Sequence, residues 1–142
     1  MLQAANMANT AAGRVQANTG STVAASKLDH VGSWLLSQQG GATDTVSVTN
    51  TLTNSGTLQS AGSETLTADQ ITNTGTLIAE GNLSASVTSS LDNQATGVVQ
   101  AGQQLAVHGA GAALTNAAGG KMLGDGLAID VASIDNSGTL QG

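Results

Sequence analysis

Few side chains in this chain could perform chemistry, and their spacing limits what that chemistry could be. The only histidines are His30 and His108, each a candidate metal ligand or proton carrier. Three acids, Glu64, Asp69 and Glu80, fall within a short stretch and are candidates for a general acid and base that cleaves a glycosidic bond. Such chemistry requires the carboxylates to converge on one face, so the elements that position them decide the question.

For each of these candidates, the sequence favours a purely structural role over metal binding or catalysis. The histidines lie several repeats apart, so we interpret His30 as a turn substitution and His108 as a surface residue. The Gly-Asp pattern of Gly124 to Asp130 belongs to calcium-binding turns only where it recurs on successive turns, and it occurs once here. The glycine pair Gly109-Ala-Gly111 has no helix after it to hold a phosphate. The three acids are expected in different columns. We therefore predict no catalytic residue, no cofactor and no metal site.

Composition narrows the class of protein further. Of 142 residues, 39% are hydrophobic, yet Trp34 is the only aromatic residue, which favours a narrow core of aliphatic side chains. Nineteen glycines and no proline suit many turns joined by uninterrupted strands. Three basic residues against nine acidic ones give a net charge of −6, so nucleic acid and anionic lipid are poor partners. The chain has no cysteine, and no signal peptide or membrane span is visible.

A repeated phrase of the form apolar-x-Asn-x-Gly-x-apolar organises the whole chain. Clear copies are Leu52 to Leu58, Ile71 to Leu77 and Ile134 to Leu140, with looser copies between them. Seven repeats begin near residues 7, 28, 52, 71, 91, 114 and 134, and extra residues fall in expected loops at Gln38 to Ala42 and His108 to Ala113. A period of about twenty residues is that of a unit which buries its apolar side by stacking on its neighbours.

Apolar and polar residues alternate within each repeat, which predicts short strands and no helix. Strands on this period fit an all-β parallel β-helix, a solenoid of about six to seven coils with about twenty residues per coil. At about 4.8 Å per coil, its length would be roughly 30 Å. We expect residues 1–142 to form a single segment of a longer shaft, because neither end resembles a cap.

Stacking predicts columns of equivalent residues. One core column is Met7, Leu28, Leu52, Ile71, Leu91, Leu114 and Ile134. A second core column is Val15, Trp34, Leu58, Leu77, Val99, Met122 and Leu140. A third is expected to include Leu66, Leu83, Leu105 and Leu127. A hydrogen-bonded amide ladder is expected from Asn9, Asn54, Asn73, Asn93, Asn116 and Asn136, with His30 in the same column. Turn glycines that supply backbone angles a Cβ would hinder are expected at Gly56, Gly75, Gly97, Gly120 and Gly138.

These phrases resemble the filamentous haemagglutinin repeats, which build the shafts of exoproteins exported by two-partner secretion in Gram-negative bacteria. The passages that carry the resemblance are Leu52 to Leu66, Ile71 to Leu83, Leu91 to Leu105 and Ile134 to Gly142. The resemblance implies a right-handed β-helix, export through an outer-membrane transporter, and a secreted or cell-surface location. The second repeat departs from the pattern, since His30 and Trp34 replace the asparagine and the small aliphatic residue.

The leading functional hypothesis is a non-enzymatic shaft segment of a large secreted adhesin, which presents binding regions to an unidentified cell-surface receptor. One alternative is the same shaft in a contact-dependent growth-inhibition effector with a distant toxin module. A carbohydrate-active β-helix enzyme is a third hypothesis, from a different class. End-to-end self-association of the segment is a further expectation, because open coil ends expose unpaired backbone.

Overall fold

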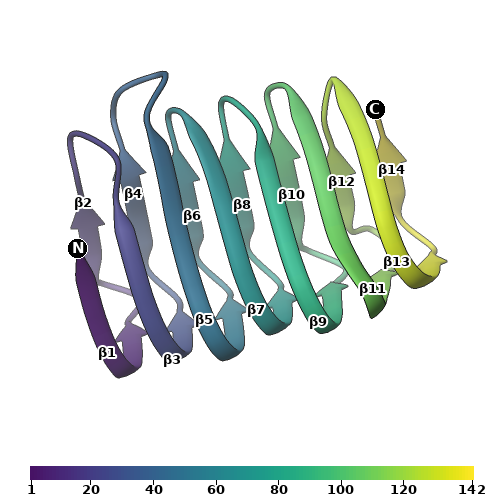
Figure 1. Ribbon diagram of the computed structural model, residues 1–142, viewed down its shortest axis with the longest axis horizontal. Coiled ribbons are helices and arrows are strands. Elements are labelled where there is room, and N and C mark those ends of the chain that lie inside the picture. The colour runs from purple at the N-terminus through teal and green to yellow at the C-terminus, as the bar shows by residue number, and fades with distance from the viewer.

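The computed structural model describes residues 1–142, which wind into a parallel β-solenoid (Figure 1). Two seven-stranded parallel sheets run side by side along its length, and each coil contributes one strand to each. The first sheet contains β1 (Leu2–Asn9), β3 (Thr22–His30), β5 (Thr43–Asn54), β7 (Ser63–Asn73), β9 (Leu83–Asn93), β11 (Gln104–Asn116) and β13 (Gly126–Asn136). The second sheet contains β2 (Arg14–Gln16), β4 (Ser33–Ser37), β6 (Thr57–Ser60), β8 (Thr76–Ala79), β10 (Val98–Ala101), β12 (Lys121–Leu123) and β14 (Thr139–Gln141). The all-β solenoid predicted from the sequence is confirmed, and no helix is present that could cross a membrane.

The long strands of the first sheet bend sharply, as the curved ribbons of Figure 1 show. From β3 onward the register between successive first-sheet strands shifts within the strand, for example between Ser47 and Thr51 of β5, whereas β1 and β3 pair without a shift. In β11 the shift lies between His108 and Ala113. The extra residues of this coil therefore form a bulge inside a strand, so the expectation of a loop at His108 to Ala113 is wrong. The extra residues Gln38 to Ala42, by contrast, do form the turn between β4 and β5.

The core follows the stacked repeats, and both of the first two columns appear in the strand register. Met7 pairs with Leu28, and the pairing continues coil by coil to Ile134. Val15 pairs with Trp34, and this series continues to Leu140. The buried members of both columns belong to one cluster of 24 hydrophobic residues. A narrow interior filled by aliphatic side chains explains why the chain needs only one aromatic residue.

The third predicted column is wrong in one member. Leu83 pairs with Leu105, and Leu105 pairs with Leu127, as expected. Leu66, however, pairs with Val46 on one side and Ala85 on the other. The residue of that coil which pairs with Leu83 is Glu64. The turn that leads from the second sheet back to the first differs in length from coil to coil. Counting residues from the repeat phrase therefore selects Leu66 in place of Glu64, an error of two residues that leaves the chosen residue on the same inward face of the strand.

Glycine is needed at the repeat turns for a different physical reason from the one expected. Only Gly41 and Gly119 have positive φ angles, so the backbone angles of the repeat glycines are open to other residues. A Cβ on Gly56 would instead lie 2.1 Å from the carbonyl oxygen of Gly32, and one on Gly75 would lie 2.2 Å from that of Gly56. Glycine is required here because the preceding coil approaches too closely for any side chain.

Candidate functional site

The asparagines at the end of the first-sheet strands form a continuous chain of amide hydrogen bonds. Asn54 Nδ2 donates to Asn73 Oδ1, and Asn73 Nδ2 donates to Asn93 Oδ1, each at 2.8 Å. The chain continues through Asn116 to Asn136 at the same distance. All of these side chains are buried except that of Asn136. Each amide from Asn73 to Asn116 donates to the next coil and accepts from the previous one, so all the ladder hydrogen bonds point in one direction along the solenoid axis.

The ladder amides from Asn54 to Asn116 each make a second hydrogen bond that links the first sheet to the second. The Nδ2 of Asn54 makes a second bond to the carbonyl oxygen of Thr76 at 3.1 Å, and that of Asn73 bonds to the carbonyl of Val98 at 3.2 Å. These acceptors belong to second-sheet strands of the following coil. Both amide hydrogens are thereby satisfied inside the protein, which is the condition for burying a polar side chain without a large penalty.

His30 interrupts this ladder. Its Nδ1 lies 3.2 Å from Asn9 Nδ2, and its Nε2 lies 2.9 Å from the carbonyl oxygen of Thr57. An amide must donate in the first contact and a carbonyl must accept in the second, so the hydrogen of the neutral ring sits on Nε2. No donor remains for the next rung, and Asn54 Oδ1 is buried without a partner. Asn9 is therefore bonded to His30 but separated from the ladder that runs from Asn54 to Asn136, so the expected continuation of the ladder through His30 to Asn9 is wrong.

The environment of His30 is that of a core side chain. It is 1% exposed, and its ring centroid lies 5.7 Å from that of Trp34 at an interplanar angle of 46°. Burial lowers the pKa of His30, against the smaller opposing effect of the hydrogen bond to Thr57. His108, the other histidine, is exposed on β11, where its backbone neighbours are Ser86 and Asp130. The two histidines thus occupy unrelated places in the fold.

The acids singled out from the sequence also occupy separate environments. Glu80 is exposed in the turn after β8, while Asp69 lies at the surface bend of β7. Asp69 accepts hydrogen bonds from the hydroxyls of Ser89 and Thr88, which lower its pKa. Glu64 alone points into the core, where it is 1% exposed. No face of the solenoid brings the three carboxylates together.

Sequence reasoning missed the neighbour of Glu64. Asp44 pairs with it in register on the adjacent coil and is 0% exposed. Two positions after Asp44 in β5 comes the buried Val46, and two positions after Glu64 in β7 comes the buried Leu66. The same alternation that identified the strands therefore carried the signal that both acids face inward.

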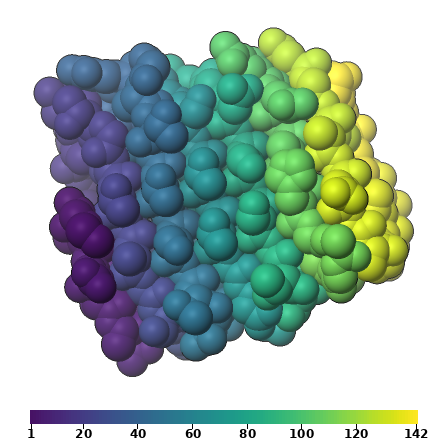
Figure 2. Space-filling model, viewed as in Figure 1, coloured from purple at the N-terminus to yellow at the C-terminus, as the bar shows by residue number.

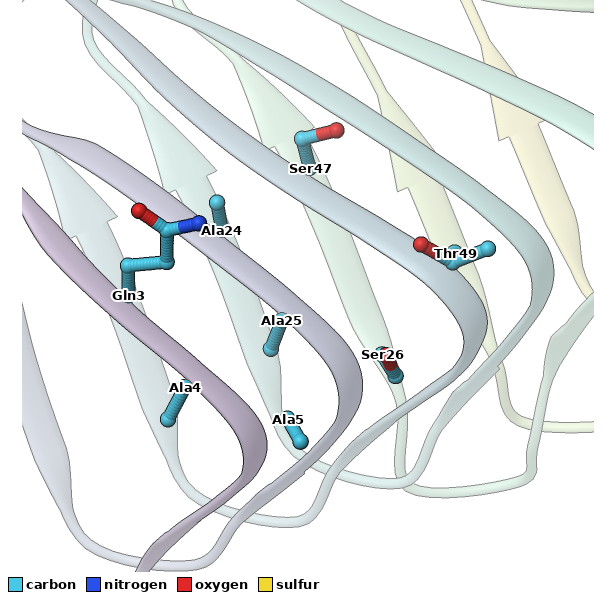
Figure 3. Close-up of a pocket in the computed structure, with 8 residues that line it drawn as sticks. All are labelled: Gln3, Ala4, Ala5, Ala24, Ala25, Ser26, Ser47 and Thr49. Atoms are coloured by element: carbon cyan, nitrogen blue, oxygen red, sulfur yellow. The ribbon is translucent and has the colours of Figure 1, made fainter.

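The outer surface is hollowed only shallowly. Figure 2 shows side chains of successive coils forming parallel rows on one face. One hollow, with a volume of about 300 Å³, is lined by short uncharged side chains including Ala4, Ala24 and Ser47 (Figure 3). A second of about 590 Å³ follows the turn glycines and is bordered by hydroxyl side chains such as Thr57 and Thr76. Neither hollow gathers the acids or histidines that a catalytic site would need.

Stacked coils of one repeated design, joined by an internal amide ladder, define a parallel β-solenoid. The haemagglutinin repeat model matches residues 1–59 and 41–142, which together cover the whole chain. The chain belongs to the haemagglutinin repeat family, as the repeat phrases predicted. No curated protein and no solved structure matches it. Members of this family are typically non-catalytic structural repeats of secreted bacterial exoproteins.

Proposed function

We propose that this solenoid is a shaft segment of a large adhesin on the surface of a Gram-negative bacterium, where it holds binding regions away from the cell. The observation that carries the proposal is the family match over the entire chain. The apolar columns and the amide ladder, which pass from coil to coil, support it. A rod serves as a spacer only if each coil is bound to the next along its whole length.

The proposal includes partners suggested by the family. Export would use the outer-membrane transporter of a two-partner secretion system, and the adhesive function would require a receptor on another cell. The acidic chain, with a net charge of −6, is not proposed to bind nucleic acid. The contact-dependent growth-inhibition alternative uses the same shaft, and a toxin module encoded at the 3′ end of the parent gene would distinguish it.

A spacer and a binding module make opposite predictions in two measurements. Beads coated with the segment should adhere to host or bacterial cells no better than beads coated with an inert protein. In the parent protein, removing the coil from Ile71 to Ser90 should keep adhesion and shorten the rod by about 4.8 Å. Specific adhesion of the coated beads, or loss of adhesion with the deletion of a single coil that leaves the fold intact, would contradict the spacer role. Cleavage of a polysaccharide by the segment would support the enzyme hypothesis instead.

A further inference from the structure

The core contains one polar cluster at a place where the next coils are apolar. Asp44 of β5 and Glu64 of β7 are paired in register, and the same column continues with Leu83 and Leu105. The two acids are 0% and 1% exposed. The cluster therefore replaces two layers of hydrophobic core with two carboxyl groups, and the rest of the column shows that leucine suits this position.

Asp44 is surrounded by hydrogen-bond donors. The backbone amide of Ser21 donates to its Oδ1 at 2.5 Å, and the hydroxyls of Ser37 and Ser60 donate to its Oδ2 at 2.5 and 2.6 Å. Both serines are 0% exposed. These three donors satisfy both oxygens of the Asp44 carboxyl group inside the core.

Glu64 has no such partners. Both of its carboxyl oxygens are buried and neither makes a hydrogen bond. Asp44 is the one titratable group that acts on it through charge, since β4 and β6 carry none and Asp69, Glu80 and Asp92 lie elsewhere on the surface or its turns. The three basic residues, Arg14, Lys27 and Lys121, are all exposed. Two buried carboxyl groups without a countercharge cost several kcal/mol unless something neutralises them.

We propose that the Asp44–Glu64 pair binds one calcium ion inside the solenoid. Two carboxylates match the charge of a divalent cation, and the hydroxyls of Ser37 and Ser60 add further oxygen ligands of the kind that calcium prefers. The carbonyl oxygen of Ser63, which accepts a hydrogen bond from Ser60 Oγ at 3.4 Å, is a further oxygen ligand at the same corner. Calcium accepts such irregular oxygen sets, whereas magnesium retains several of its waters and suits a dry site poorly.

The site requires the ion to enter as the coils assemble, because both acids are closed to solvent in the folded protein. It also requires competition with protons. Burial, and then the charge of Asp44, raises the pKa of Glu64 to about 8. A metal must displace that proton, so calcium binding should strengthen as the pH rises towards and above this value.

The test compares the 142-residue chain with its Glu64→Leu variant, refolded either in excess EDTA or at a series of free Ca²⁺ concentrations. Leucine is the matched control because the chain itself places Leu83 next in this column. Above the dissociation constant, each tenfold rise in free Ca²⁺ should raise the folded-to-unfolded ratio of the wild type by about tenfold. The variant should show no such dependence, and Mg²⁺ should have little effect on either protein.

A second measurement tests the proposal even if the chain fails to refold in EDTA. Equilibrium dialysis of the refolded wild type against radioactive calcium should find one ion per chain above the pKa of Glu64 and much less well below it. Unfolding curves identical in Ca²⁺ and EDTA, together with no bound ion, would show that a proton alone neutralises Glu64 and would overturn the proposal. The spacer role would be unaffected, because it depends on the stack of coils and not on this ion.

Discussion

Removing one rung of the amide ladder tests how the solenoid is held together. The perturbation is Asn73→Ala, in the middle of the ladder. Asn73 accepts a hydrogen bond from Asn54 and donates to Asn93 and to the carbonyl oxygen of Val98. The substitution deletes all three bonds and leaves the buried Oδ1 of Asn93 without a donor.

The expected magnitude follows from these losses. Three hydrogen bonds at about 1 kcal/mol each, plus a penalty of about 1–3 kcal/mol for a buried unsatisfied group, give a destabilisation of roughly 4–6 kcal/mol. The matched control is Asn136→Ala, because Asn136 is exposed and accepts one ladder bond from Asn116. Its loss should cost no more than about 1.5 kcal/mol.

The assay is urea unfolding of both variants, followed by circular dichroism and by the fluorescence of the single tryptophan, Trp34. Trp34 is 2% exposed and lies two coils from Asn73, so a cooperative loss of structure should reach it. Equal free-energy costs for the two variants would refute the reasoning, because they would show that the internal ladder bonds add nothing beyond the residue type. A change at Asn73 that leaves the Trp34 transition unmoved would show that the coils unfold independently.

Three further predictions concern the core and its titratable groups. Leu77→Ala should destabilise the protein by about 2–5 kcal/mol because Leu77 is fully buried, while Thr57→Ala, on the outer face, should cost under about 0.5 kcal/mol in the same urea assay. The pKa of His30 is lowered from 6.5 by burial, so the stability it contributes is complete above that pH and is lost as the pH falls below it; unfolding midpoints measured across this range should lose that slope in His30→Asn. The pKa of Glu64 is raised from 4.5 to about 8, so in the presence of EDTA the free energy of unfolding should fall as the pH rises between those values, by up to about 5 kcal/mol. Glu64→Leu should abolish that fall, and a wild-type stability that stays constant over the same interval would contradict the assigned environment of Glu64.

The sequence alone determined the architecture of this protein and the residues that stack. Positions such as Leu52, Leu58 and Asn54 recur with each coil, and the physical requirement that like residues share a buried column makes their alignment readable without coordinates. The strands followed from the alternation of apolar and polar residues, because one face of each strand must point into a narrow core.

Only the tertiary structure decided which residues pair between coils where the turns differ in length. Turn lengths differ between coils, so the pairing of Glu64 with Asp44 and Leu83 emerges from the hydrogen bonds between neighbouring coils and not from the repeat phrase. The hydrogen bonds of His30 likewise depend on Asn9 from the preceding coil and Thr57 from the following coil, which are brought to the ring by the winding of the chain. Local patterns fix which side of a strand faces inward, whereas register across a turn depends on contacts between residues about twenty positions apart.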